Sequence, residues 1–131
     1  MLRLVNNEEK YYEFIFKLRF CDENIESFVI QTVPNYNDHY SYMLKYNDNY
    51  YICLDGDNPV GFIGVIDDDI RLATIHNKKN QGIGKFMVNE LMEKYPNAIA
   101  KVKIDNQASL KLFQSCGFKP KYLILEKEYV Q

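Results

Sequence analysis

No apolar stretch in the sequence is long enough to span a bilayer, and the first residues do not form a signal-peptide pattern. There are only three cysteines, Cys21, Cys53 and Cys116, and they lie far apart, without the spacing of metal ligands. We therefore expect no membrane segment, no metal site, and free thiols in a reducing, cytoplasmic environment. The formal net charge of −2 gives no indication of binding to nucleic acid or to an anionic membrane.

Apolar and aromatic residues are abundant, at 47% and 15% of the chain. This composition is typical of a packed protein and not of a disordered one. The 131 residues match the size of one domain and contain no repeat, low-complexity tract or linker. We therefore predict a single domain over residues 1–131.

The first part of the chain predicts one strand and two helices. Residues 1–5 are typical of a strand, and residues 8–20 carry apolar side chains at helical spacing. A second helix is predicted to begin with Asn37 or Asp38 as its N-cap. Its apolar face is predicted to consist of Tyr40, Met43 and Leu44.

The middle of the chain predicts an antiparallel meander followed by a crossover. Turns rich in Asp and Gly join three predicted strands, over residues 50–54, 60–66 and 70–75. A helix over residues 82–95 separates the third strand from residues 98–104, which alternate apolar and basic side chains as a strand does. Because a helix joins them, a right-handed crossover would make these last two strands parallel.

The end of the chain predicts one more helix and one more strand. The helix begins at residues 105–106 and ends at Gly117 as its C-cap. Residues 118–129 are predicted to return as a final strand. The fold class is therefore mixed α/β, with a central, mostly antiparallel sheet flanked by helices.

The junction between the strand at 70–75 and the next helix has the properties of a phosphate site. The first N–H groups of a helix have no intrahelical acceptor, and the helix dipole is positive there. Gly82 and Gly84 allow tight turns and close approach of a ligand to the backbone, and Lys78, Lys79 and Lys85 add positive charge. The pattern predicts a pyrophosphate cradle, although a simple tight turn into a core helix is the alternative. It is neither a P-loop nor a dinucleotide fingerprint.

Two blocks of sequence resemble one known family. Residues 79–84 (Lys-Asn-Gln-Gly-Ile-Gly) look like the acetyl-CoA pyrophosphate loop Gln/Arg-x-x-Gly-x-Gly/Ala. Residues 101–118 look like the second motif that follows it, with Asn, then Ala-Ser, an aromatic residue and a closing Gly-Phe. In this order and at this separation, the two blocks resemble the GCN5-related N-acetyltransferase (GNAT) family.

The resemblance implies acetyl transfer from acetyl-CoA to a primary amine, by direct attack through a tetrahedral intermediate. It implies a GNAT-like fold in which the parallel strands near 70–75 and 98–104 splay apart around the thioester. The N–H of Thr74 is our candidate for stabilising the developing oxyanion. The positions implied for cofactor binding are Leu72, Ala73, Thr74, Lys79, Asn80, Gln81, Gly82, Ile83, Gly84, Lys85, Asn106, Ser109 and Phe113.

The sequence departs from the family pattern at positions that bear on catalysis. Phe113 stands where many members have a tyrosine that protonates the departing thiolate, and Lys101 stands where some have a glutamate base. His76 and His39 are therefore the candidate general bases, although a structural role is the alternative for each.

The acceptor is expected to be a small-molecule amine, with an amino sugar or a metabolite favoured. Acetylation of a protein N-terminus or lysine, or a catalytically silent CoA-binding module, are the alternatives. The tyrosines of the first half could line an acceptor pocket or fill the core: Tyr36, Tyr40, Tyr42 and Tyr46. Residues 122–130 are apolar enough to allow pairing of two copies into a homodimer.

Overall fold

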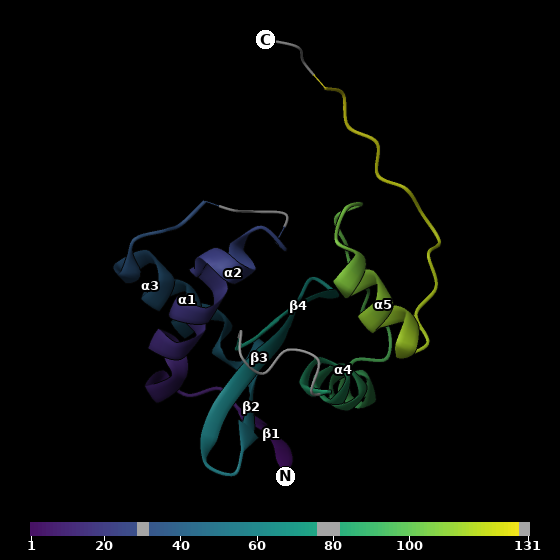
Figure 1. Cartoon of the computed structure of the whole chain (residues 1–131). Coiled ribbons are helices and arrows are strands. Elements are labelled where there is room, and N and C mark those ends of the chain that lie inside the picture. The colour runs from purple at the N-terminus through teal and green to yellow at the C-terminus, as the bar shows by residue number, and fades with distance from the viewer. Residues whose placement is uncertain (29–31, 76–81, 129–131) are drawn as a thin grey trace.

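The computed structural model describes residues 1–28, 32–75 and 82–128. Figure 1 shows the arrangement of its helices and strands. In chain order these are β1 (Leu2–Asn6), η1 (Glu9–Tyr11), α1 (Tyr12–Phe20), α2 (Asp22–Ile25), α3 (Tyr36–Tyr46), η2 (Asn47–Asn49), β2 (Tyr50–Asp55), β3 (Asn58–Ile66), β4 (Asp69–Thr74), α4 (Ile83–Lys94) and α5 (Gln107–Ser115). None of the helices in these described ranges is long and apolar enough to cross a membrane.

The four strands form one antiparallel sheet in the order β1-β2-β3-β4. The predicted meander is therefore confirmed. Its last turn is tight, because Asp67 and Asp68 adopt φ angles of 52° and 64°, the left-handed conformation that two-residue hairpins need. Aspartate tolerates this conformation better than most residues with a side chain.

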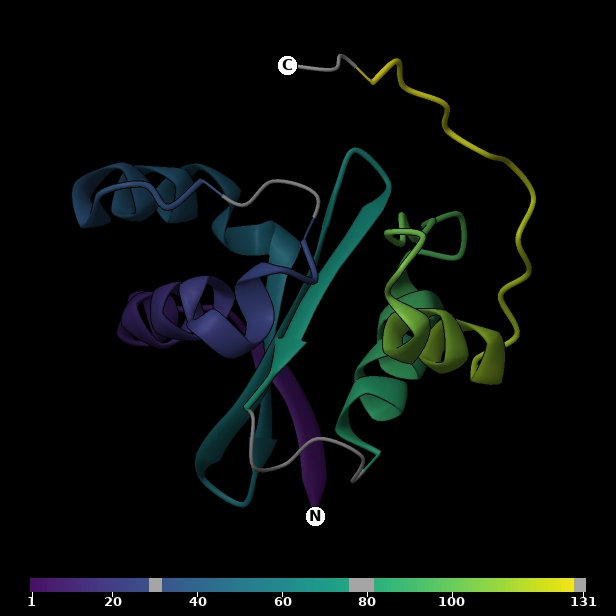
Figure 2. The same cartoon turned by 45° about the horizontal axis from the view of Figure 1, so that its top comes forward.

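Helices cover both faces of the sheet, α1 and α3 on one and α4 and α5 on the other (Figure 2). Because strand side chains alternate between faces, β3 contributes to both cores. Phe62 packs in the core with α1 and α3, whereas Ile63 packs in the core with α4 and α5. Both side chains are fully buried, so β3 is the centre of the fold.

The start and the buried face of α3 differ from the prediction. Its N-cap is Asn35, whose side chain accepts a hydrogen bond from the N–H of Asp38 at 2.8 Å. Buried residues on this helix are His39 and Met43, whereas the predicted core residue Leu44 is 57% exposed. Residues 39 and 43 are four positions apart and so share the face that packs against α1, where His39 takes the place that an apolar residue was expected to fill.

The start and end of α5 follow the sequence signals. The side chain of Asn106 accepts from the N–H of Ser109 at 3.1 Å and so caps the helix. Gly117 ends it with a φ of 92°, as a C-cap glycine does.

The predicted strand over residues 98–104 is reduced to one bridge. Asp69 and Ile99 form an isolated parallel bridge, and residues 100–103 are assigned to no strand. The predicted parallel direction is correct, but the predicted length is wrong. Beyond the bridge these residues pair with no strand on either edge within the described chain.

The predicted final strand is also absent from the described part of residues 118–129. Residues 118–128 belong to no helix or strand and extend away from the sheet (Figure 1). This leaves a run of large apolar side chains between 72% and 90% exposed: Tyr122, Leu123, Ile124 and Leu125.

Candidate active site

Beyond Ile70 the outer edge of β4 pairs with no described strand, which leaves a gap toward the segment that follows α4; the side chain of Asn24 reaches this edge and donates to the carbonyl of Thr74 at 3.4 Å. The N–H of Ile99 donates to the carbonyl of Asp68 at 2.7 Å, and the N–H of Ile70 donates to the carbonyl of Ile99 at 2.9 Å. In an antiparallel ladder, every second N–H points away from the partner strand. The N–H of Ile70 points away from β3, because it donates to Ile99. The N–H groups of Leu72 and Thr74, two and four residues later, therefore also point away from β3. Their N–H groups face the gap, where no described strand pairs with them.

The start of α4 offers a second set of N–H groups. The first intrahelical bond runs from the N–H of Phe86 to the carbonyl of Gly82 at 3.0 Å, so the amides of residues 82–85 have no intrahelical acceptor. The N-cap residue is Gly82, which has no side chain to cap this end, and the first turn contains no acidic residue. These properties fit a bound anion such as a diphosphate.

The two glycines at this helix start have different surroundings. Gly82 has a φ of 79°, and a Cβ placed there would meet nothing within 4 Å. A Cβ on Gly84 would approach the side chain of Leu112 to 3.1 Å. Gly84 lets α4 pack closely against α5, and its expected role in admitting a ligand stays a prediction. Five predicted residues before this helix lie outside the described residues: His76, Lys78, Lys79, Asn80 and Gln81.

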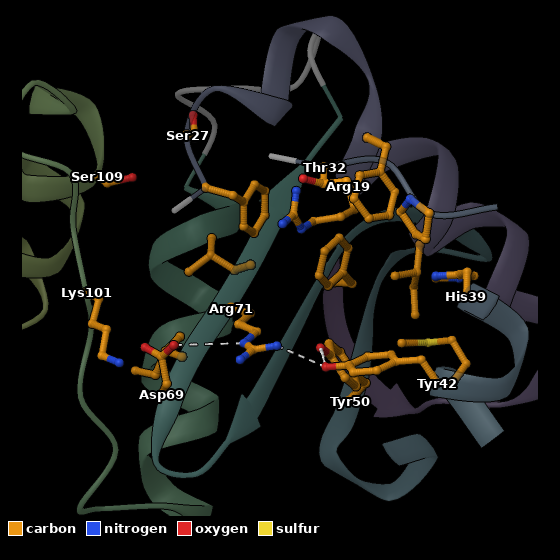
Figure 3. Close-up of a pocket in the computed structure, with 18 of the residues that line it drawn as sticks. Arg19, Ser27, Thr32, His39, Tyr42, Tyr50, Asp69, Arg71, Lys101 and Ser109 are labelled. Carbon is orange, nitrogen blue, oxygen red and sulfur yellow. Dashed lines mark hydrogen bonds and ion pairs between the residues drawn. The ribbon is translucent and has the colours of Figure 1, made fainter. Parts of the chain in front are cut away.

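A cavity of about 460 Å³ lies beside the gap, between α1, α3, β4 and residues 101–113 (Figure 3). Several predicted residues from separate parts of the chain line it: His39, Leu72, Asn106, Ser109 and Phe113. Ala73 and Thr74 are not among its lining residues. The cavity therefore brings both halves of the chain to one site.

Phe113 and Asn106 present different chemistry to this cavity. Phe113 is buried, and its ring packs edge to face against Phe118, with 5.2 Å between centroids. It offers an apolar wall and no proton. Since the Asn106 side-chain oxygen caps α5, its amide nitrogen is the atom left to donate to a ligand.

His39 connects α3 to α1. Its Nε2 lies 2.8 Å from the carbonyl oxygen of Tyr12, which can only accept, so Nε2 carries the proton. Its ring packs edge to face against Phe16 at 4.9 Å. Burial lowers the pKa of His39, and the bond to Tyr12 opposes this only in part. His39 is therefore neutral at pH 7, and only Nδ1 remains to accept a proton.

A chain of polar contacts crosses the cavity wall (Figure 3). Arg71 on β4 donates to the hydroxyl of Tyr42 at 3.0 Å, and this hydroxyl lies 2.8 Å from the hydroxyl of Tyr50. The Nε of Arg71 lies 3.9 Å from a carboxylate oxygen of Asp69. Burial strongly raises the pKa of Tyr50, so its phenol stays protonated.

A second arginine reaches the cavity from α1. The guanidinium carbon of Arg19 lies 3.6 Å from the ring centroid of Phe28 and 4.6 Å from that of Phe20. Burial, and then repulsion from Arg71, lower the pKa of Arg19 to about 10. Sequence reasoning missed both arginines, because each stands alone among apolar residues. Of the four tyrosines considered for an acceptor pocket, only Tyr42 lines the cavity.

The acetyltransferase (GNAT) family model matches residues 12–118. The chain belongs to this family. It is therefore an acyltransferase of the N-acetyltransferase type. Both motifs identified in the sequence lie within the matched region.

Solved structures with this fold have acceptors of several kinds. Spermidine N-acetyltransferase from Vibrio cholerae, in complex with CoA and spermine, is 17% identical with a TM-score of 0.79, covering 99% of this chain and 88% of that one. Ribosomal-protein-alanine N-acetyltransferase from Brucella melitensis is 17% identical with a TM-score of 0.73, and the match covers 91% of this chain and 84% of that one. Aminoglycoside acetyltransferase AAC(6')-Ib, in complex with coenzyme A, is 14% identical with a TM-score of 0.70, covering 92% and 86%. No curated protein matches the sequence.

The buried His39 predicts a specific loss of stability in acid. Its folded-state pKa lies below the unfolded value, so its contribution is complete above about pH 6.5 and is lost as the pH falls through the folded-state pKa. Urea unfolding between pH 7.5 and 5 should therefore show a decline in unfolding free energy that is shallower in His39→Gln. His76 is present in both proteins, so its titration cancels. An equal decline in both proteins would show that His39 is not buried in its neutral form.

Proposed function

We propose that this protein transfers an acetyl group from acetyl-CoA to the primary amine of a small molecule. The observation that carries the proposal is the free edge of β4, where the amides of Leu72 and Thr74 face a gap beside the cavity. Family membership supports the use of acetyl-CoA, and the cavity between α1, α3 and β4 is of a size that suits a small acceptor.

Acetyl-CoA supplies the acetyl group as a thioester, which an amine can attack directly. The amides of residues 82–85 would hold its diphosphate, with the positive end of the α4 dipole behind them. The amides of Leu72 and Thr74, with the side-chain nitrogen of Asn106, would hold the pantetheine arm. Ser109 and Phe113 would line the end of the site that holds this arm. The cradle needs backbone donors more than side chains, so Lys79 in place of Gln or Arg is compatible with it.

Catalysis would depend on positioning and on one backbone donor. The N–H of Thr74 is the candidate that stabilises negative charge developing on the carbonyl oxygen, a contribution typically worth roughly 10²–10³ in rate. Phe113 cannot donate a proton, so CoA would leave as a thiolate, which is feasible because thiols are weak bases with a pKa of about 8.5. We propose His76 as the general base, because burial lowers the pKa of His39 and makes its one free nitrogen, Nδ1, a weaker proton acceptor.

The main rival is a module that binds CoA without transferring acetyl groups. It is favoured by Phe113, which leaves the thiolate without the usual proton donor. Incubation with acetyl-CoA and a panel of amines, while free thiol is followed, separates the two. We expect thiol release with at least one small amine, and a large loss of rate in His76→Gln. Tight CoA binding with no thiol release across small amines, peptide N-termini and lysine peptides would contradict transferase function.

The cradle predicts that Gly82→Ala weakens CoA binding at least tenfold. The new methyl group would occupy the space over the helix start, and a positive φ is unfavourable for alanine by about 1–2 kcal/mol. Gly56→Ala is the matched control, because Gly56 also has a positive φ, of 63°, with nothing within 4 Å, but lies in the β2–β3 turn. Calorimetric titration with CoA measures both. Equal CoA affinity in the two variants would contradict the assignment of diphosphate binding to residues 82–85.

The exposed tail supports the proposal that two copies pair. Leu123 and Leu125 are 84% and 89% exposed, and the segment after Ile99 has no ladder partner among the described residues. We expect sedimentation to give a dimer, and the double substitution Leu123→Lys, Leu125→Lys to give a monomer. Leu44→Lys, at an exposed leucine on α3, should stay dimeric. A monomeric parent protein, or a dimer that survives the tail substitutions, would contradict pairing through the tail.

A further inference from the structure

Apolar side chains form the buried part of the cavity between α1, α3 and β4. Ile15, Met43 and Phe62 line it and are 2%, 1% and 1% exposed. The half-buried rings of Phe20 and Phe28 line it beside them. We call these five side chains the apolar floor of the cavity. A ligand that reaches this floor meets hydrocarbon and aromatic surface.

The buried polar residues of the lining bond to other groups of the protein. The hydroxyl of Tyr50 lies 2.8 Å from that of Tyr42, which accepts from Arg71 at 3.0 Å. Arg71 in turn pairs with Asp69. Nε2 of His39 donates to a backbone carbonyl on α1. A ligand hydroxyl placed against the floor would therefore give up its bonds to water and gain few in return, which costs free energy.

The other hydroxyl and charged side chains of the lining lie at the mouth of the cavity. Ser27, Thr32, Asp38 and Lys101 line it and are exposed to solvent. Because they are exposed, these groups can stay hydrated when a ligand binds. The free energy of binding would then come mainly from apolar surface that is removed from water at the floor.

We propose that the acceptor is a small primary amine that carries an aromatic ring, and that this ring binds on the apolar floor. The inference rests on the proposed acetyl transfer for the identity of the amine as acceptor. An aromatic ring would extend a cluster that exists already, because the centroids of Tyr42 and Tyr50, and of Tyr50 and Phe62, are each 6.1 Å apart. An amino sugar fits less well, since its hydroxyls would face the floor without partners.

The amine of such a ligand would lie at the other side of the cavity. Figure 3 shows Ser109 on the side opposite to His39 and Tyr42. Asn106 and Phe113 also line the cavity, and under the proposed function this side receives the acetyl group. There the amine nitrogen would replace the sulfur on the acetyl carbon. The proton of the amine would pass to the general base, and CoA would leave as the thiolate.

The test uses two series of amines that keep the amine constant and vary the group attached to it. One series is the amides of phenylalanine, leucine, alanine and serine, and the other is 2-phenylethylamine beside ethanolamine. We expect kcat/KM for the aromatic member to exceed that of alanine amide, serine amide or ethanolamine by roughly ten- to a hundredfold, as burial of a phenyl group typically gives. Leucine amide should fall between.

Two results would overturn the proposal while leaving acetyl transfer intact. One is turnover of serine amide, ethanolamine, glucosamine or spermidine that is as fast as that of the aromatic amines. The other is a value for leucine amide that equals or exceeds that of phenylalanine amide, which would contradict the preference for an aromatic ring.

Variants of the floor locate the effect. Phe20→Ala and Phe28→Ala should raise KM for the aromatic amine roughly tenfold, with a smaller change in kcat, and reduce its preference over the small amine. Phe20→Leu keeps an apolar side chain and should keep part of the preference, which separates it from a loss of folding. Phe14→Ala is the matched control, because Phe14 is also half-buried on α1 but is not among the described residues that line the cavity. A preference that is unchanged in both alanine variants of the floor would overturn the proposal.

A binding measurement separates this inference from the proposed function. The same amines are titrated calorimetrically into the protein saturated with CoA, which requires no turnover. If no amine releases thiol but the aromatic amines bind tightest and lose affinity in Phe20→Ala, acetyl transfer fails and the aromatic site stands. If thiol is released but neither rate nor affinity depends on the aromatic ring, acetyl transfer stands and this inference fails.

Discussion

Two backbone hydrogen bonds join the segment after α4 to the edge of the sheet, and the candidate site depends on where this pairing stops. They join Ile99 to the start of β4, through the carbonyl of Asp68 and the N–H of Ile70. Beyond this bridge the two segments diverge, so the later amides of β4 face a gap. Continued pairing would have closed the edge of β4 and left no N–H group for a ligand. The candidate site therefore exists because the pairing between β4 and the segment after α4 ends at Ile70.

The two faces of the sheet have different tasks in this account. Helix α4 packs on one face, and the four amides at its start, which have no intrahelical acceptor and no acidic residue in the first turn, would face an anion under the proposed function. Helices α1 and α3 pack on the other face and form the cavity that contains Arg19 and Tyr42. Under the proposed function, the donor of the acyl group would be recognised mainly by backbone, and the acceptor by side chains. This division explains how one fold can serve acceptors of different chemistry.

Patterns local in sequence predicted the fold well, and contacts distant in sequence did not follow from them. The meander, the helix after Gly82 and the cap of α5 by Asn106 each depend on a few adjacent residues. The length of the strand after Ala98 and the place of the final segment depend on partners far along the chain, and both were predicted wrongly. The same limit applies to the site: Arg19 and Arg71 are 52 positions apart, and only folding shows that they line one cavity.

The central claim is that backbone amides at the start of α4 and along the edge of β4 bind CoA. The most direct measurement follows backbone amide resonances by nuclear magnetic resonance while CoA is added to the isotopically labelled protein. The account predicts the largest changes at residues 82–85 and at Leu72 and Thr74, and small changes at the β2–β3 turn. Saturation with CoA that leaves these amide resonances unmoved, or moves only those on α1 and α3, would contradict it.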